Sequence, residues 1–253
     1  MAASINAAAS YTTDGDTTVL VPNARHLPYV IGHGGLDQRV PLTNFLQHLS
    51  AFDAAGVPYA AELRPAEDHL AYAVKDEFGS LVARLDGRSR VRTPGTIDYG
   101  FRPALQEPAL GIGPDGGWWL SGVRARLRTP GTVARAVVRS DAQPTAPLTT
   151  ALQRSVDATS APSPALVLVR DALPAVAPRR APTLHATLTG VSGLVVDMPA
   201  AGFRRGEPVT VDGTTDGPAV LRLTGLAAGT QVQVVGGPRV RADRAGVAHV
   251  RLG

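Results

Sequence analysis

Residues 27–70 read LPYVIGHGGLDQRVPLTNFLQHLSAFDAAGVPYAAELRPAEDHL, and their pattern predicts an α/β arrangement for the first part of the chain. It opens with a compact apolar run, residues 27–33, which ends among glycines and is typical of a short buried strand in a parallel sheet. The next segment changes to a helical period, with apolar side chains along one face: Leu42, Phe45, Leu46, Leu49 and Phe52. Gly56 follows at a position suited to a left-handed helix end. A strand at 27–33 and a helix at 41–55 are therefore predicted.

The alternation of strand and helix continues on both sides of this core. Residues 57–63 predict a second strand, residues 65–69 a loop, and residues 71–85 a second amphipathic helix. Residues 1–16 are small and polar and predict a tail or loop, which a short strand at 17–21 follows. Residues 1–87 are thus expected to form an α/β segment of βαβα type with a right-handed crossover.

Two residues of this segment carry a carboxylate and an imidazole, which catalytic sites often combine for proton transfer. Asp37 follows the first predicted strand across a glycine-rich turn, and His69 follows the second strand directly before a helix. In a catalytic triad, a carboxylate holds a histidine in one tautomer while the other ring nitrogen faces the nucleophile. The segment predicts such an acid–base pair, and the alternative is an unremarkable surface aspartate and histidine. His33 lies four residues before Asp37 and either joins this site or bonds to nearby backbone.

The motif G-x-x-D-x-x-V-P at residues 34–41, followed by E-D-H at residues 67–69, resembles the last part of an α/β-hydrolase catalytic domain. The similarity covers residues 23–87 and is greatest to the prolyl-oligopeptidase-like and esterase branches. It implies that Asp37 is the triad acid, that His69 is the triad base, and that Asp68 orders the loop. It also implies hydrolysis of carboxylic ester or peptide bonds by acyl transfer, without a cofactor.

The nucleophile elbow of that family, G-x-S-x-G, is absent from these 253 residues. The segment GVSGL at residues 190–194 has a different spacing and follows the histidine, and Ser50 and Ser80 fall on predicted helices without an activating neighbour. The nucleophile is therefore expected from elsewhere, from a second chain or another copy in a homo-oligomer. The isolated chain is expected to be weakly active or inactive.

After residue 87 the pattern changes to short alternating runs separated by proline and glycine turns, which is typical of a β-sandwich or jelly roll. Residues 88–253 are expected to form this all-β region, with residues 141–164 as a Pro/Thr/Ser-rich connection. Trp118 and Trp119 follow a glycine-rich turn. Because neighbouring strand residues point to opposite faces, one of them is expected in the core and the other at the surface, as a candidate substrate-binding side chain. The alternative is that both are covered.

Composition restricts the classes of partner and cofactor. Without cysteine, the chain has no disulfide, thiolate metal site or cysteine nucleophile. The formal charge is +4, but the arginines alternate with acids along the sequence, so no nucleic-acid partner is predicted. No apolar run approaches the ~20 residues of a membrane span, and no signal peptide is recognised, which leaves secreted and cytoplasmic locations open. The histidine spacings match no metal signature, and His48, His185 and His249 look isolated.

Two function classes follow from the sequence. The first is a chain derived from a serine hydrolase, which supplies the acid and the general base for ester or peptide hydrolysis. The second is a non-catalytic β-rich binding or accessory protein, which recognises a polymer, a carbohydrate or a partner protein.

Overall fold

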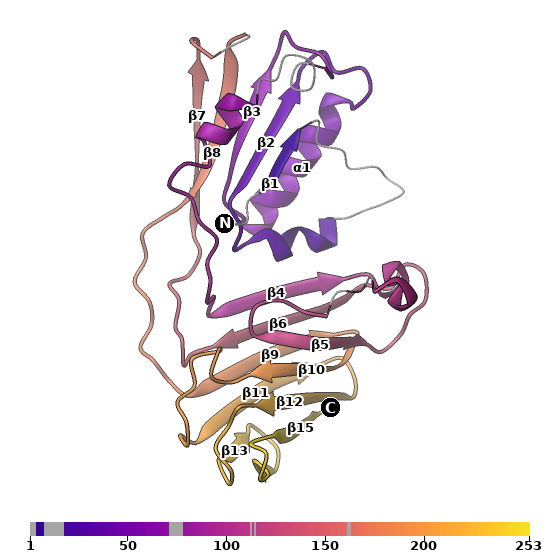
Figure 1. Ribbon diagram of the computed structural model, residues 1–253, viewed down its shortest axis with the longest axis vertical. Helices are drawn as coiled ribbons and strands as arrows, with labels where there is room; N and C mark the ends of the chain where they lie inside the picture. The colour runs from indigo at the N-terminus through magenta and orange to yellow at the C-terminus, as the bar shows by residue number, and fades with distance from the viewer. Residues whose placement is uncertain (1–3, 8–17, 71–77, 112, 114, 161–162) are drawn as a thin grey trace. The chain divides into compact units, whose positions relative to one another are not determined.

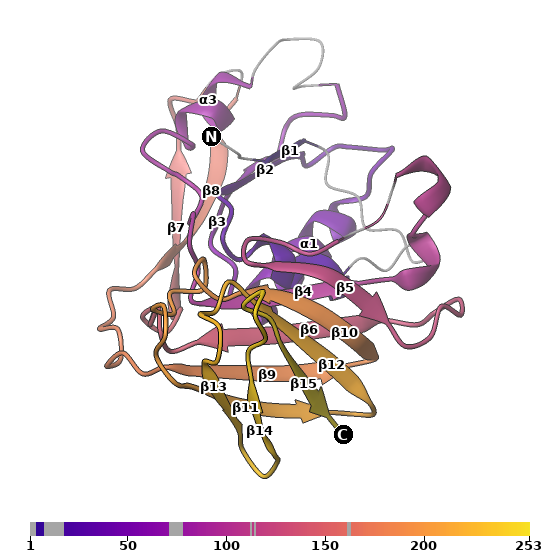
Figure 2. The ribbon, with the colours of Figure 1, turned by 60° about the horizontal axis from the view of Figure 1, so that its bottom comes forward.

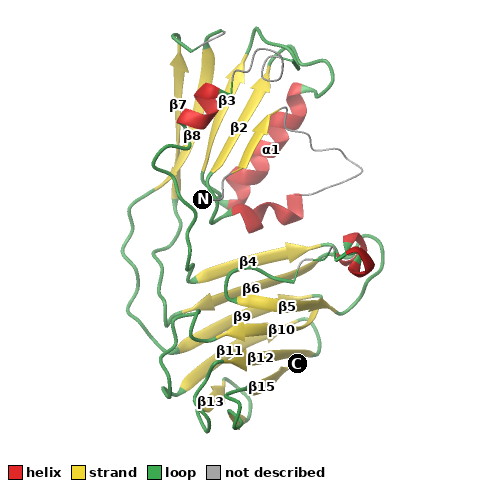
Figure 3. Cartoon of the chain, viewed as in Figure 1, coloured by secondary structure: helices red, strands yellow, loops and turns green. Residues whose placement is uncertain are grey.

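The computed structural model describes residues 4–7, 18–70, 78–111, 113, 115–160 and 163–253. The chain is mostly β and divides into two compact units, neither of which is continuous in sequence (Figure 1; Figure 3). The first unit comprises residues 1–91 and 148–175, and the second comprises residues 92–147 and 176–253.

The first unit is built on a mixed sheet in the order β1-β2-β3-β8-β7 (Figure 1). The first three strands are parallel, whereas β8 and β7 run antiparallel to their neighbours. Strands and helices of this unit are β1 (Ser4–Ala7), η2 (Thr18–Ala24, a 3-10 helix), β2 (Tyr29–Gly34), α1 (Leu42–Ala55), β3 (Tyr59–Arg64), α3 (Gly79–Ala83), β7 (Thr150–Asp157) and β8 (Ala165–Ala172).

Helix α1 lies where its apolar period predicts. Phe45, Leu49 and Phe52 are buried against Ile31 and other residues of one sheet face, although Leu46 is exposed. The helix ends at Gly56, whose φ of 63° is the left-handed conformation expected of a helix-ending glycine. The predicted β2–α1–β3 unit is therefore confirmed as two parallel strands joined by a helix.

Strand β3 is covered on both faces. Tyr59 and Ala61 pack in the cluster that contains α1, whereas Ala60 packs on the opposite face with Leu81 of α3. This alternation is the two-residue period of a strand. Because β2 and β3 are adjacent and parallel, the loop that follows β3 lies next to the turn that follows β2, at the same edge of the sheet.

Three local predictions for this unit need revision. The strand predicted at residues 17–21 is the 3-10 helix η2, because Val21 and Ala24, three positions apart, both turn toward the α1 core. The tail predicted at residues 1–16 contains strand β1. Of the helix predicted at 71–85, residues 71–77 lie outside the described residues, and α3 spans only Gly79–Ala83.

The assignment of residues 148–175 to the all-β region is also corrected. The connection expected at 141–164 contains β7, and β7 and β8 extend the first sheet as a hairpin. Strand β8 joins β3 because it is apolar on both faces: Leu168 packs on the α1 side and Val169 on the α3 side. Arg170 anchors it further, since its Nε lies 2.5 Å from Oδ1 of Asp53 on α1.

The second unit contains two sheets, one in the order β15-β12-β10-β5 and one in the order β14-β13-β11-β9-β6-β4 (Figure 2). Its elements are β4 (Thr96–Phe101), η3 (Pro103–Leu105), η4 (Pro108–Leu110), β5 (Leu120–Ala125), β6 (Ala134–Ser140), β9 (Thr183–Thr189), β10 (Val191–Asp197), β11 (Val209–Thr215), β12 (Ala219–Thr224), β13 (Gln231–Val234), β14 (Arg239–Arg241) and β15 (Ala248–Leu252).

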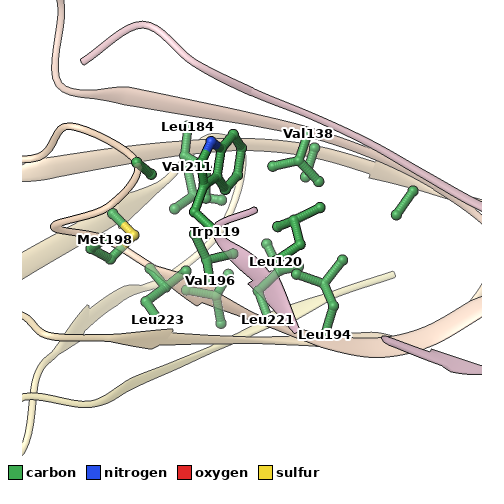
Figure 4. Packing of buried hydrophobic residues seen from close by; sticks show 14 of the residues in the cluster. Trp119, Leu120, Val138, Leu184, Leu194, Val196, Met198, Val211, Leu221 and Leu223 are labelled. Carbon is green, nitrogen blue, oxygen red and sulfur yellow. The ribbon is translucent and has the colours of Figure 1, made fainter. Parts of the chain in front are cut away.

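These two sheets share one apolar core and so form a β-sandwich. Leu221 of the smaller sheet and Leu184 of the larger one are fully buried in the same cluster, and the ring of Trp119 lies among such side chains (Figure 4). The pairs β10–β12, β9–β11 and β11–β13 are parallel, which separates this sandwich from an antiparallel jelly roll.

Candidate acid–base site

Asp37 lies in the turn that joins β2 to α1. Its Oδ1 accepts hydrogen bonds from the backbone N–H groups of Arg39 and Val40, each at 2.8 Å. These bonds fix the carboxylate and leave Oδ2 for another donor. The side chain of Asp37 is only 1% exposed, so the acid is held by fixed donors out of contact with bulk water.

His69 lies in the loop that follows β3, and two backbone hydrogen bonds join this loop to the turn that carries the acid. The N–H of Gly35 donates to the carbonyl of Arg64 at 2.8 Å, and the N–H of Leu36 donates to the carbonyl of Glu67 at 2.9 Å. The relative position of acid and histidine is therefore set by the main chain of both loops.

The two loops approach so closely because glycines occupy the contact. A Cβ on Gly34 would lie 2.5 Å from the carbonyl oxygen of Asp68, and a Cβ on Gly35 would lie 2.8 Å from Cα of Pro65. Both neighbours are backbone atoms, which do not move aside easily. The glycines after β2 thus serve the packing of one loop on the other, as well as the turn itself.

The imidazole of His69 meets the carboxylate of Asp37, with Nδ1 2.9 Å from Oδ2. Burial alone would raise the pKa of Asp37, but the N–H of Val40, the His69 ring and the N–H of Arg39 together bring that pKa below its ordinary value. The acid is therefore ionised at neutral pH and accepts the Nδ1 proton.

That hydrogen bond leaves Nε2 of a neutral His69 with its lone pair. The side chain of His69 is 32% exposed. Within the described part of the chain, no residue forms a hydrogen bond with Nε2. The pair can thus act as an oriented general base toward a group that approaches from solvent. The structure brings together the two residues predicted from the sequence, and their catalytic roles stay a prediction.

Two residues near the pair, Asp68 and His33, have contacts that stabilise the fold. Oδ1 of Asp68 accepts the N–H of Leu70 at 2.8 Å, as expected of a loop-ordering acid. His33 is fully buried and its ring stacks on Phe45 with centroids 5.2 Å apart. Burial lowers the pKa of His33, against the opposing charge of Asp37. Neither ring nitrogen of His33 forms a hydrogen bond with the His69 ring.

A buried ionic network that the sequence reasoning missed lies on the other face of β3. Glu62 and Arg64 are fully buried, and Nη2 of Arg64 lies 3.2 Å from Oε2 of Glu62. Arg84 lies 2.5 Å from Oε1 of the same glutamate, and the hydroxyl of Ser80 donates to Oε2 at 2.9 Å. The signal was the pair of charges inside the apolar run at 57–64. The Ser80 hydroxyl is thus a donor to Glu62 within this network.

His185 is also less isolated than its sequence context suggests. Its Nε2 lies 2.9 Å from Asp141 and its Nδ1 lies 3.1 Å from Asp212, on the outer side of the larger sandwich sheet. Among the described residues, no group of three or more histidine and carboxylate side chains is arranged to hold a metal ion. This cluster therefore joins neighbouring segments of the sandwich.

The two tryptophans precede β5 in a tight turn and do not lie in the strand itself. Trp119 is 3% exposed, and its indole N–H donates to the carbonyl of Pro94 at 2.6 Å. Trp118 is partly buried against the same core, and its φ of 55° is unusual for a bulky residue. Trp119 is thus unavailable to a ligand, and substrate binding stays a prediction for Trp118 alone.

No protein-family model matches the chain, and neither the curated proteins nor the solved structures contain a match. Among the helices that the structure describes, none is long and apolar enough to cross a membrane.

A two-stranded α/β segment would expose an open sheet edge to a partner, but β1 pairs with β2 and β8 pairs with β3. A partner chain stays a prediction that now depends on the acid–base site.

Proposed function

We propose that Asp37 and His69 are the acid and the general base of a hydrolase site for carboxylic ester or peptide bonds, with a nucleophile that these 253 residues do not supply. The observation that carries the proposal is the 2.9 Å contact between His69 Nδ1 and a buried, backbone-held carboxylate, with Nε2 unbonded among the described residues. The resemblance of residues 34–41 and 67–69 to the end of an α/β-hydrolase domain supports it.

In the proposed reaction, Nε2 of His69 removes the proton of a hydroxyl nucleophile as its oxygen attacks the carbonyl carbon of the substrate. Asp37 stabilises the imidazolium that forms. The proton then passes from Nε2 to the leaving oxygen or nitrogen as the acyl bond breaks, and the nucleophile keeps the acyl group. Water, activated by the same imidazole, releases the acid in the second half of the reaction.

The test uses the full chain alone and after mixing with candidate partner chains that carry a G-x-S-x-G elbow. A fluorophosphonate probe is expected to leave this chain unlabelled and to label the serine of the partner. Hydrolysis of an activated ester is expected to rise on mixing, and to fall by about two to four orders of magnitude with His69→Ala or Asp37→Asn in this chain.

Asp68→Asn serves as the matched control, because Asp68 is the neighbouring acid but bonds to the backbone of Leu70. It is expected to retain the activity of the mixture. Strong ester hydrolysis by the chain alone that disappears with His69→Ala would contradict the need for an outside nucleophile. Equal activity of the Asp37→Asn and wild-type mixtures would contradict the role of the pair.

A further inference from the structure

The outer face of the four-stranded sandwich sheet gathers arginines that are far apart in sequence. On β12, Leu221 and Leu223 are buried in the core, so the alternate residues point away from it. The exposed side chains on this outer face form what we call the arginine face: Ser121 and Arg124 of β5, where the strand register shifts, Val220 and Arg222 of β12, and His249 and Arg251 of β15. Asp197, at the end of β10, is exposed at the margin of this face.

The strand register arranges these side chains in two rows across the sheet. One row contains Arg124, Gly193, Val220 and Arg251, and the other contains Ser121, Val195, Arg222 and His249. Three strand spacings of ~4.8 Å place the backbones of the two outer arginines roughly 14 Å apart. Arg222 is a diagonal neighbour of Arg251, a relation that puts such positions about 7–8 Å apart.

These three arginines form no ion pair, unlike other arginines of the unit, and the one acid near them on the face is Asp197, a diagonal neighbour of Arg222 among the described residues. Arg126 pairs with Asp216 at 3.1 Å, and Arg135 pairs with Asp98 at 2.6 Å. Within the described residues, by contrast, no carboxylate pairs with Arg124, Arg222 or Arg251, or with any side chain of the arginine face. The three guanidinium groups are therefore not neutralised by an ion pair within the described residues, and they can pair with an anionic ligand.

We propose that the arginine face binds a linear anionic polysaccharide, whose carboxylate or sulfate groups pair with Arg124, Arg222 and Arg251. The planar guanidinium matches the two oxygens of such groups. The exposed face of the sheet presents its side chains in rows, which suits an extended chain, and the Ser121 hydroxyl and the His249 ring supply partners for sugar hydroxyls.

The composition of the face favours this class of polyanion over nucleic acid. No aromatic side chain lies in either row, so the face offers no platform on which bases could stack. The face also consists of side chains on a four-stranded sheet and has no helix or protruding ribbon that could enter a major groove. The proposal is independent of the acid–base pair and lies in the other unit.

The test measures binding of the full chain to heparin, which is sulfated, and to polygalacturonate, which is carboxylated, over a range of salt concentrations. A variant with Arg124→Gln, Arg222→Gln and Arg251→Gln is expected to bind at least one of them about tenfold or more weakly at low salt, and to lose much of the salt dependence. Circular dichroism and thermal unfolding verify that the variant is folded, because all three substitutions are at exposed positions.

The control variant removes the same charge elsewhere in the second unit, with Arg179→Gln, Arg205→Gln and Arg241→Gln, all exposed and outside the four-stranded sheet. It is expected to bind within about twofold of the wild type. His69→Ala is expected to bind like the wild type, which separates this result from the proposed hydrolysis. If both triple variants bind the polysaccharide equally weakly, the effect depends on net charge alone, and this result would contradict a specific site on the arginine face.

Two other results would also overturn the proposal. One is the absence of binding to both polysaccharides at low salt. The other is tighter binding of a DNA oligonucleotide or of anionic lipid vesicles than of either polysaccharide, lost in the Arg124–Arg222–Arg251 variant, since the face would then serve a different class of partner.

Discussion

Nδ1 of His69 lies 2.9 Å from Oδ2 of Asp37, although the two residues are 32 positions apart and follow different strands. Neither side chain achieves this alone. The carboxylate is oriented by two backbone donors in its own turn, and the histidine loop is joined to that turn through main-chain bonds at Gly35 and Leu36. The acid–base geometry is thus a property of two loops that fold onto each other.

Gly34→Ala is expected to disturb this geometry, because the new Cβ would lie 2.5 Å from the carbonyl oxygen of Asp68. Backbone must shift to relieve the clash, at a cost of about 1–3 kcal/mol. Hydrogen exchange of the loop after β3 and the NMR signals of the His69 ring should both change. Gly79→Ala is the control, since nothing lies within 4 Å of its Cβ position. Unchanged His69 signals in Gly34→Ala would contradict the role of the glycine contact.

Arg64→Met is expected to destabilise the first unit by roughly 3–5 kcal/mol, because it removes one partner of a fully buried ion pair and leaves Glu62 with less compensation. The double variant Glu62→Leu/Arg64→Met should recover much of the loss, since neither fully buried charge remains and Arg84 keeps Asp157 3.8 Å away. Denaturant-dependent hydrogen exchange of β3 amides measures both.

The control for this pair is Arg88→Met, which removes a partly exposed pair with Asp171 and should cost less than about 1 kcal/mol. If the double variant is as unstable as the sum of its single variants, the network does not behave as a buried ion pair.

The stability of the first unit is expected to fall as the pH drops from 6.5 toward 4. Burial lowers the pKa of His48 from 6.5 to about 4. In that window the unfolded chain binds a proton that the folded chain does not, so acid favours unfolding. At about 1.4 kcal/mol per pKa unit, the loss is roughly 3 kcal/mol.

Replacement of His48 by Leu should flatten this dependence, and burial of His33, which lowers its pKa as well, should leave a smaller residual slope. Hydrogen exchange of α1 amides reports on the relevant unit, whereas both tryptophans of the chain lie in the other one. An identical pH profile in His48→Leu and the wild type would contradict the assignment.

Trp119→Ala should destabilise the sandwich by about 3–5 kcal/mol, because a nearly fully buried ring is lost from the core. Trp118→Gly should cost less, about 2 kcal/mol or below, since part of the lost packing is offset by relief of the φ of 55°. Urea unfolding followed by circular dichroism compares the two. A larger loss of unfolding free energy in Trp118→Gly than in Trp119→Ala would contradict the assignment of Trp119 as the core residue.

Much of the first unit was predictable because its signals are local. The apolar period of α1 and the helix-ending Gly56 can each be recognised from a few neighbouring residues. The same holds for the apolar runs that form the parallel strands on either side of the helix. The positions of Asp37 and His69 follow from those elements, since each residue comes just after a strand of the same sheet edge. The hydrolase ancestry and the reaction stay predictions.

The remaining features depend on contacts between distant segments. The pairing of β8 with β3 brings Leu166 opposite Leu63, more than 100 residues earlier in the chain. The apolar pattern of residues 165–172 predicts a strand but does not indicate which sheet that strand joins. The arginine face has the same origin: Arg124, Arg222 and Arg251 look scattered among acids until the register of β5, β10, β12 and β15 aligns them. Charge counted along the sequence does not reveal charge gathered on a surface.

The return of residues 148–175 to the first sheet sets an order of events during synthesis. Strands β4, β5 and β6 leave the ribosome before β7 and β8, so β4 and β6 can pair while β3 still has an unpaired edge. Once β7 and β8 complete the first sheet, β9 emerges and pairs with β6 across the whole inserted hairpin. A nascent chain stalled before residue 165 therefore exposes two unfinished sheets at once, a state in which strand edges can pair wrongly.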